Sequence, residues 1–486
     1  MDERQSGGAR RTEPEPLEEP RATPPAGRRR WFRSSFAVGL VLAAVVGLGI
    51  RVAFASSQGS DHSFYDSAFY SGEATALAEG RGFVDPPVYT YGKTPGPAAE
   101  HPPLTALVLA PVAKVFPDSQ LAMRLTFALL GSVGVVLIGL LGAAVGGSRT
   151  GLIAAGLAAV YPFLWVNDGV VMAESLAVVL TTSALLMTYR MLTRPTWTKA
   201  VALGALCGLA ALARAELLLL APLLAVGIGL ANPGPVRRRC GLGAVAVVVA
   251  LLVVSPWVAF NLSRFREPVL MTTDGDVNLL ASTCDETFYG PHLGSADWRC
   301  LIRTTRSEDN STAAAEYRAT AIRYTRAHAG RYAVVVLARL GRDWSFFGLG
   351  RSLVPFEGRP RWVTALGLVF YYPMLVLAVG GAVILTRRRV PWWPFLAPPV
   401  IVCATALVSW GQPRYRAIAE PCLVVLSAVA ICTLWRLAAQ RRGLRSRTSQ
   451  RLPRPEDRHR SAIMSVLCRG PRFLTSARSM GSVASR

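Results

Sequence analysis

The stretch SFAVGLVLAAVVGLGIRVAFA, residues 35–55, decides the fold class. It is apolar over the roughly 20 residues that a helix needs to cross the hydrocarbon core of a bilayer. Runs at 125–146 and 240–260 have the same character. The 486-residue chain is 51% hydrophobic and 17% charged, with a mean hydropathy of +0.34. These features predict an all-α polytopic membrane protein rather than a soluble domain.

The apolar runs predict about ten transmembrane helices. A polar segment precedes the first run and no small-residue cleavage site clearly follows it, so we expect a retained helix and not a signal peptide. An apolar piece at 104–116 is too short to span and is predicted to be re-entrant or interfacial. The predicted spans lie near 35–55, 121–145, 150–167, 170–191, 199–213, 215–231, 240–260, 362–386, 391–410 and 417–437.

The distribution of charge in the loops predicts how these helices are oriented across the membrane. If the first helix leaves the cytoplasm, most loop Arg and Lys fall inside and the acids fall outside, as the positive-inside rule requires. Two large outer loops result, 56–120 and 261–361, which we expect to carry amphipathic juxtamembrane helices. The prediction is a multi-pass protein of the cell membrane with both termini cytoplasmic.

The ends of the chain are predicted to be disordered. Residues 1–34 form a cytoplasmic segment rich in Pro, Arg and Glu, 35–437 the transmembrane domain, and 438–486 a basic cytoplasmic tail. The formal net charge is +23, and much of the excess lies in the tail. Beside a membrane helix such a tail favours anionic lipid heads, so we expect membrane lipids as partners and no nucleic acid.

The first outer loop opens with an acidic stretch, GSDHSFYDSAFYSGEATALAEGRGFVDP, residues 59–86. Asp66, Tyr70 and Glu73 have helical spacing and share one face. A short helix on the outer membrane surface would present them together to a substrate. The alternative is a solvated polar face.

Other polar residues gather at the predicted outer boundary. His101 follows Glu100 and precedes two prolines, which suits a metal or phosphate contact or only a loop kink. Asp168 lies at the boundary, and Glu174 is predicted about a turn and a half inside its helix, where a carboxylate is a functional candidate. The alternative is an interfacial acid that reaches water.

Three arginines stand on the same side, where the positive-inside pattern does not favour them. Arg214 lies two residues before Glu216, and Arg414 and Arg416 open the last helix. Guanidinium groups near a bilayer surface suit a phosphate; structural ion pairs, such as Arg416 with Glu420, are the alternative.

Cys284 and Cys300 bracket a segment of the second outer loop. Outside the cytoplasm such a pair is predicted to be oxidised to a disulfide. The chain contains no Walker A loop, HExxH, CxxC or GxSxG motif, so we assign no site of these kinds.

Five segments in order resemble the C superfamily of membrane glycosyltransferases, and most closely the actinobacterial relatives of protein O-mannosyltransferases and aminoarabinose lipid A transferases. The segments are DSAFYSGEATALAEGRGFVDP, AEHPPL, YPFLWVNDGVVMAESL, LAALARAELLLLAPL and PRYRAIAEP. The resemblance covers roughly 35–437. It implies a helical bundle whose first outer loop carries a catalytic acid, a polyprenyl-phosphate sugar donor, and inversion at the anomeric carbon.

By register with the family, the catalytic acid falls on Asp66, with Asp61 as the alternative. Relatives often show two adjacent acids or Asp-Glu here, whereas this chain has Asp-Ser at 66–67. The relatives' E-K-P-P segment matches Glu100 and His101, with His in place of Lys. A phosphate contact by His101 would therefore depend on its protonation.

The chemistry assigns roles to these residues. An inverting transferase needs a base for the acceptor hydroxyl, here Asp66, and positive charge on the departing phosphate. The phosphate candidates are His101, Arg214, Arg414 and Arg416. Glu100, Asp168 or Glu174 would orient sugar or acceptor, or hold a divalent metal ion, for which Glu100 is the candidate ligand.

The predicted function is a mannosyltransferase-like transfer from a polyprenyl-phosphate sugar to a lipid, polysaccharide or protein acceptor on the outer face. The alternative is a transporter or flippase for lipid-linked sugars, and a third is a non-catalytic anchor in the envelope. Transporters place ionisable groups near the midplane, whereas most acids here fall in the outer loops. The sequence leaves the sugar and the acceptor open.

Overall fold

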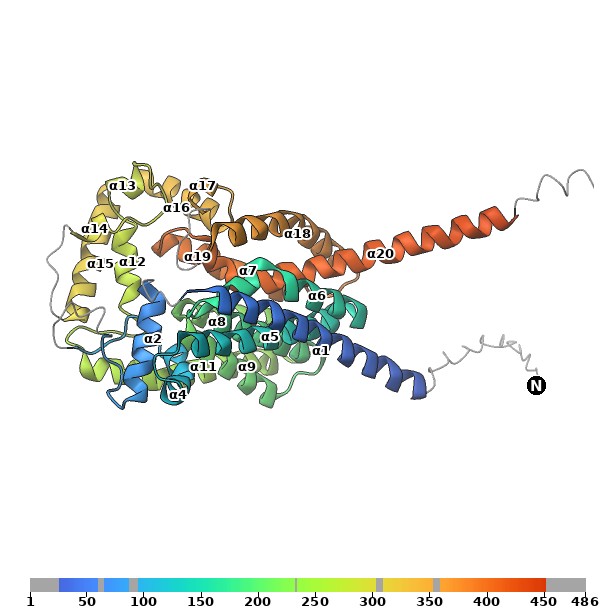
Figure 1. The fold of residues 1–486 in the computed structure, drawn as a ribbon, viewed down its shortest axis with the longest axis horizontal. Helices are drawn as coiled ribbons and strands as arrows, with labels where there is room; N and C mark the ends of the chain where they lie inside the picture. Colours follow the sequence, from blue (N-terminus) through green and yellow to red (C-terminus); the bar gives the residue numbers. More distant parts are fainter. Residues whose placement is uncertain are drawn as a thin grey trace, which may run out of the picture. The chain divides into compact units, whose positions relative to one another are not determined.

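A computed structural model describes residues 26–59, 65–86, 95–231, 234–302, 309–352 and 359–451 (Figure 1). The chain divides into two units, 1–429 and 430–486, and the helical bundle with its outer loops belongs to the first. In the second, the structure describes 430–451, the C-terminal part of one long helix. The described residues contain no β-strand; a single bridge joins Val84 and Pro97.

The bundle is built from long apolar helices. Its elements are α1 (Ala26–Ser57), α5 (Gln120–Gly146), α6 (Ser148–Val160), α7 (Pro162–Trp165), η1 (Val166–Gly169), α8 (Glu174–Thr193), α9 (Trp197–Ala213), η2 (Ala215–Leu219), α10 (Leu220–Ala231), α11 (Val236–Arg264), α18 (Arg361–Arg387), η3 (Trp393–Leu396), α19 (Ala397–Val408), η4 (Pro413–Ala419) and α20 (Glu420–Arg451).

Shorter helices form the two outer loops. The first loop contains α2 (Tyr65–Ala78) and α4 (Leu104–Val115). The second contains α12 (Asp274–Ala281), α13 (Asp285–Phe288), α14 (Arg299–Ile302), α15 (Asn310–Ala327), α16 (Ala329–Asp343) and α17 (Leu349–Ser352).

The prediction of an all-α polytopic membrane protein is confirmed. Six helices in the described part of the chain are long and apolar enough to cross a membrane, and a pair bent by 62° would make a seventh. The other three predicted spans form shorter apolar helices, Trp197–Ala213, Ala215–Ala231 and Trp393–Val408. The number of ten spans therefore stays a prediction.

Two helix boundaries differ from the prediction in ways that matter for the site. The predicted span 150–167 is wrong as one helix, because it breaks at Tyr161 before Pro162, whose ring has no N–H to continue the helix. The following helix starts at Glu174 rather than 170. Glu174 is thus the first residue of α8, at the end of a helix and not inside it, where unpaired backbone N–H groups favour a carboxylate.

The ends of the predicted domain also differ. α1 starts at Ala26, before the predicted 35, and α20 continues to Arg451, beyond the predicted 437. Both extensions are rich in Arg, which has a high helix propensity. The predicted disorder of 1–25 and 452–486 lies outside the described residues.

Small residues allow the helices to approach closely. α9 packs against α8 and α11, and Gly208 faces α11 so closely that a Cβ there would stand 2.7 Å from Val253 Cβ. In a bilayer the hydrophobic effect does not drive helices together, because lipid tails are as apolar as the side chains. Small residues let the backbones approach closely, so that van der Waals packing holds the helices together. The bundle thereby forms a continuous core, from Leu40 in α1 to Val429 in α20.

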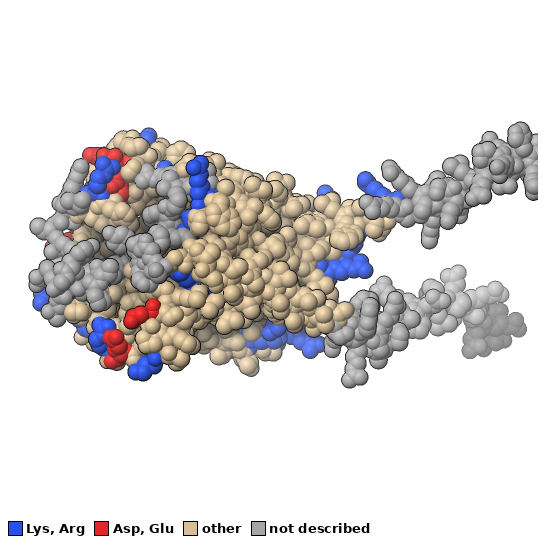
Figure 2. Space-filling model, in the orientation of Figure 1, with Lys and Arg blue, Asp and Glu red and all other residues tan. Residues whose placement is uncertain are grey.

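The outer loops are held at one end of the bundle, with α2 and α12 to α15 together (Figure 1). On the face shown in Figure 2, the acidic side chains gather at this end, and a broad uncharged band follows. Arg264, at the end of α11, donates to the carbonyls of Phe83 (2.7 Å) and Ala98. The first loop is therefore fixed to the bundle, and α2 has a defined position.

Candidate active site

A cavity of about 250 Å3 lies where the outer loops meet the helix ends. Its walls come from α2, the segment before α4, the start of α8, the junction of α9 and η2, α12, the end of α19, and η4. The polar residues that line it include Asp66, Tyr70, His101, Glu174, Arg214, Glu216, Asp274, Asn278, Ser409, Arg414 and Tyr415. Six of the predicted site residues are among them.

Asp66 lies in the first turn of α2 and pairs with Arg414. The Arg414 Nη1 donates to Asp66 Oδ2 at 2.7 Å, although 348 residues separate the two in sequence. Burial alone would raise the pKa of Asp66, but the charges of Arg414 and His101 outweigh it and lower the pKa to about 2. Asp66 is therefore ionised at neutral pH.

His101 stands between two carboxylates. Its Nε2 is 3.8 Å from Asp66 Oδ1, and its Nδ1 is 3.9 Å from Asp274 Oδ2. The ring stacks on Tyr70 with 4.8 Å between centroids, and Phe69 meets it edge-on. The aromatic contacts hold the imidazole plane, so a protonated His101 would present its N–H groups to both carboxylates.

Asp274 was not predicted from the sequence. It begins α12, about 170 residues after His101, and Asn278 one turn later donates to it at 2.5 Å. Burial raises its pKa above the usual value, while His101 opposes this shift. The Asp-Gly-Asp run at 274–276 at a helix start was the available signal, but nothing in the sequence placed it beside His101.

A second ion-paired group forms the opposite wall. Arg214 donates to Glu174 through Nη1 at 2.7 Å and to Glu216 through Nε at 2.6 Å. Glu174 Oε1 also lies 3.8 Å from Arg414 Nε. Asp66, Arg414, Glu174, Arg214 and Glu216 thus form a chain of alternating charges, which brings two guanidinium groups and the Asp66 carboxylate to one cavity.

Two predicted site residues are buried in ion pairs away from this cavity. Asp168 accepts from Arg51 Nε at 2.6 Å, with both side chains 2% exposed. Arg416 is fully buried and donates to Glu420 at 2.6 Å, which is the structural ion pair predicted as the alternative to phosphate binding. Neither lines the cavity, because the bend after α6 turns Asp168 toward α1 and Arg416 points into the bundle beside Tyr371.

Glu73 also lies apart from the site. It shares a helix face with Asp66 but stands seven residues further, about 10 Å along the axis. It is fully buried and neither carboxyl oxygen has a hydrogen-bond partner. Burial raises its pKa to about 8, with Arg264 opposing the shift, so the carboxyl is largely neutral at pH 7. The predicted substrate contact of Glu73 has no support in this position.

Glu100 and Asp61 complete the predicted set. The carbonyl of Glu100 accepts from the Asp274 backbone N–H at 3.3 Å, which joins the two outer loops below His101. Glu100 does not line the cavity. Asp61 lies outside the described residues, so its role as the alternative base stays a prediction.

The geometry does not favour a metal ion at this site. Within the described ranges, no group of three or more His, Cys, Asp and Glu side chains is arranged to hold one. Asp66 and Asp274 face opposite nitrogens of His101, so one ion cannot contact both carboxylates and the ring. Glu100 belongs to no such group, and we derive no step through a metal.

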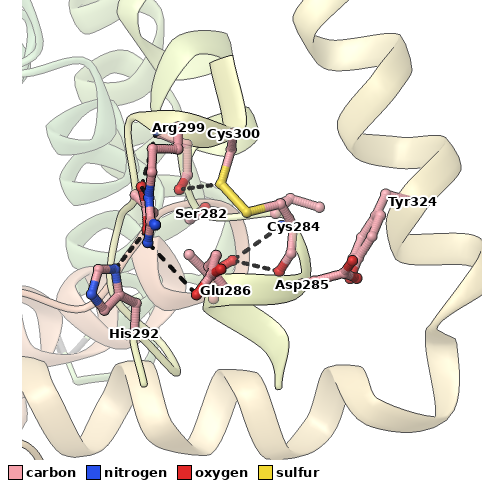
Figure 3. Close-up of a disulfide and its surroundings, with 12 residues drawn as sticks. Ser282, Cys284, Asp285, Glu286, His292, Arg299, Cys300 and Tyr324 are labelled. Carbon is pink, nitrogen blue, oxygen red and sulfur yellow. Dashed lines mark hydrogen bonds and ion pairs between the residues drawn. A yellow bond between two sulfur atoms is a disulfide. The ribbon is translucent and has the colours of Figure 1, made fainter. Parts of the chain in front are cut away.

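A larger cavity, about 850 Å3, lies on the other side of Arg414. One wall is the loop closed by the disulfide between Cys284 and Cys300, the pair predicted from the sequence (Figure 3). His292 and Arg299 both contact Asp297 in this loop, at 2.7 Å and 2.6 Å. Arg414 lines both cavities.

Comparison with known proteins agrees with the predicted resemblance. Residues 100–260 match the family described as dolichyl-phosphate-mannose-protein mannosyltransferase, a range that includes His101, Glu174 and Arg214. No curated protein matches the chain by sequence.

Solved structures of an archaeal oligosaccharyltransferase share the fold. The oligosaccharyltransferase AglB from Archaeoglobus fulgidus, in complex with an inhibitory peptide and a dolichol-phosphate, is 15% identical with a TM-score of 0.53, over 90% of this chain and 55% of that chain. A complex of the same enzyme with Zn and sulfate is 18% identical with a TM-score of 0.51, over 83% and 50%. ArnT from Cupriavidus metallidurans bound to undecaprenyl phosphate, 14% identical, has a TM-score of 0.41 over 82% and 77%.

The chain spans about half the length of the archaeal oligosaccharyltransferase. What the two share is the fold, over 90% of this chain. Through this fold and the matched segment, the chain resembles the C superfamily of membrane glycosyltransferases, as the ordered motifs predict.

Proposed function

We propose that this chain is an inverting membrane glycosyltransferase that moves a sugar from a polyprenyl-phosphate carrier to a cell-envelope acceptor. The observation that carries the proposal is the 2.7 Å contact between Asp66 and Arg414 inside a cavity at the helix ends. A carboxylate beside a guanidinium supplies the two groups that this transfer needs, a proton acceptor and a cation for the leaving phosphate.

The transfer proceeds in one displacement. The acceptor hydroxyl gives its proton to Asp66, and its oxygen forms a bond to the anomeric carbon. The bond from that carbon to the phosphate oxygen breaks, and its electron pair stays on the phosphate. Arg414, which lines both cavities, is the cation placed to meet the leaving charge, and Arg214 lies beside Glu174 on the opposite wall of the small cavity. Attack opposite to the leaving group inverts the anomer.

The surrounding residues would bind the sugar. Tyr70, Asn278 and Ser409 offer hydroxyl and amide groups around the same cavity. Carboxylates and hydroxyls accept and donate the hydrogen bonds that sugar hydroxyls need. Glu174 and Asp274 are placed to orient a sugar hydroxyl, while His101 is held between the two outer-loop helices that form the cavity.

Three features support an outer-face location in the cell membrane. The cavity lies at the end of the bundle that carries the acidic loops, as the positive-inside pattern requires. The disulfide of the second loop fits an oxidising compartment. A lipid-linked donor, as in the AglB complex with dolichol-phosphate, would reach this boundary from the bilayer, and both termini of this chain would be cytoplasmic.

A transfer assay tests the proposal. Membranes that contain the protein are incubated with labelled polyprenyl-phosphate mannose and arabinose, and transfer to envelope lipid, polysaccharide and protein is counted. Asp66→Asn is expected to lose at least 100-fold in rate, because removal of a general base typically costs 10²–10⁴-fold. Glu79→Gln, an exposed acid of the same loop, is the matched control.

Asp61→Asn decides between the two predicted bases. If Asp61→Asn loses transfer while Asp66→Asn retains it, the base assignment is wrong. If the parent protein consumes no donor but moves a lipid-linked sugar between leaflets, the transporter alternative replaces the enzyme.

A further inference from the structure

Arg414 is shared by two cavities of different charge. In the small cavity its Nη1 holds Asp66, and its Nε stands 3.8 Å from Glu174. Its side chain is 8% exposed and also borders the large cavity. The N–H donors of a guanidinium are fixed in one rigid plane. An anion in one cavity therefore competes with a carboxylate in the other for the same donors.

The large cavity favours an anion. Its described lining includes four arginines, Arg299, Arg342, Arg359 and Arg414, against the carboxylates Asp297 and Glu420. Both carboxylates are already engaged, Asp297 by Arg299 and His292 and Glu420 by Arg416. Hydrogen bonds from Arg299 hold the pKa of Asp297 well below its usual value. Among the described lining residues, arginines therefore outnumber carboxylates, and Asp66 is not one of them.

We propose that Arg414 couples the two cavities: a phosphate-diester anion in the large cavity takes the guanidinium from Asp66 and so makes Asp66 a competent base. The inference rests on the proposed function, and it adds that the donor activates the base for the acceptor. The Arg414 side chain need not move far, because its Nε stays near Glu174 while the terminal nitrogens turn from Asp66 to the phosphate.

The resting ion pair explains why such activation is needed. With Arg414 bound, the pKa of Asp66 is about 2, so the carboxylate accepts a proton poorly. Losing this partner moves the pKa toward its ordinary value of 3.8, and base strength rises with it. The other charged or titratable groups that line the small cavity are Tyr70 on α2, His101 before α4, Glu174 on α8, Arg214 after α9, Glu216 on η2, Asp274 on α12 and Tyr415 on η4, and none of them lines the large cavity.

Binding of a short prenyl methyl phosphate diester tests the exchange, since this probe carries one negative charge that does not titrate near neutral pH. If the coupling is reciprocal, a bound diester raises the proton affinity of Asp66 by some factor. Removing the Asp66 charge must then raise the affinity for the diester by the same factor. A return of the Asp66 pKa toward its ordinary value corresponds to a change in diester affinity of between about tenfold and a hundredfold. Asp66→Asn is therefore expected to bind the diester at least tenfold more tightly than the parent, measured by calorimetry in detergent.

The gain must depend on Arg414 and on the large cavity. In Arg414→Gln the effect of Asp66→Asn is expected to disappear, while Glu79→Gln binds like the parent. Arg359→Gln, whose side chain lines the large cavity and not the small one, should weaken binding with or without Asp66. Asn278→Ala, in the small cavity, should not weaken binding of this sugar-free probe.

Equal or weaker binding by Asp66→Asn overturns the coupling. The coupling is also overturned if Asn278→Ala loses diester binding while Arg359→Gln binds like the parent, because the phosphate would then lie in the small cavity. If either result is found while the protein still transfers sugar, the coupling is wrong and the proposed function remains supported. If the parent protein neither binds the diester nor consumes a donor, both the coupling and the proposed function are wrong.

Discussion

The Arg51–Asp168 pair is expected to stabilise the bundle rather than touch substrate. Asp168→Ala leaves a guanidinium that is 2% exposed without its carboxylate. Breaking a buried pair by removing one partner typically costs about 3–5 kcal/mol. Arg51 keeps weaker hydrogen bonds to the carbonyls of Gly47 (3.1 Å) and Ala159 (3.4 Å), so we expect a loss of about 3 kcal/mol in the free energy of unfolding, at the lower end of that range.

The double variant separates charge from packing. Arg51→Met with Asp168→Leu removes both charges and keeps apolar volume, and such replacements of buried pairs are often neutral or stabilising. Most of the lost stability should therefore return. Gly131→Ala is a second perturbation, because a Cβ there would stand 2.6 Å from Arg51 Nε and push the pair apart without removing a charge.

Unfolding by SDS titration in mixed micelles measures these changes, with sugar transfer assayed on the folded fraction. We expect Asp168→Ala to lower the free energy of unfolding while the folded protein still transfers sugar. An Asp168→Ala variant that unfolds like the parent protein and yet loses sugar transfer would refute the structural role and indicate that Asp168 binds substrate.

Three further predictions concern stability. Burial raises the pKa of Glu73 from 4.5 to about 8, so the folded state holds a proton that the unfolded state releases, and stability is lost as pH rises from about 4.5 to 8. Glu73→Gln should flatten melting temperature against pH over that window; an unchanged slope contradicts the assignment. Cys284→Ser with Cys300→Ser opens a loop of 16 residues and should cost about 3 kcal/mol; reductant should then have no further effect on unfolding. Gly208→Leu forces a side chain against Val253 and should cost about 1–3 kcal/mol, seen as an earlier SDS midpoint than for Gly229→Leu, where a Cβ meets nothing within 4 Å.

The long helices could be predicted because length and hydrophobicity alone specify them. The run predicted at 121–145 is α5, Gln120–Gly146, and that at 362–386 is α18, Arg361–Arg387. The break at Tyr161 was missed because the residues on both sides are apolar. A Pro inside an apolar run either kinks a helix or ends it, and packing decides which.

The site was predictable in its residue types and not in its contacts. Asp66 and Arg414 were both expected at the outer boundary, but the sequence does not show that they touch. Arg416 stands two residues from Arg414 and is equally basic. In η4 its side chain turns into the bundle toward Glu420, and only the three-dimensional packing distinguishes the two. Asp274 was missed for the same reason, since its neighbour His101 belongs to the other outer loop.

The long sequence interval between Asp66 and Arg414 has a consequence for how the protein is made. The chain emerges from the ribosome in order, so Asp66 is inserted long before the residue 348 positions later that pairs with it. Tyr161 likewise waits for Glu420, 259 residues further on. The ion pair that joins the two walls of the cavity therefore forms only after η4, close to the end of the bundle, has been made. A chain interrupted before that point would still hold His101 and Arg214 near Asp66 but would lack the guanidinium that contacts it, so the two walls of the cavity could not close on each other.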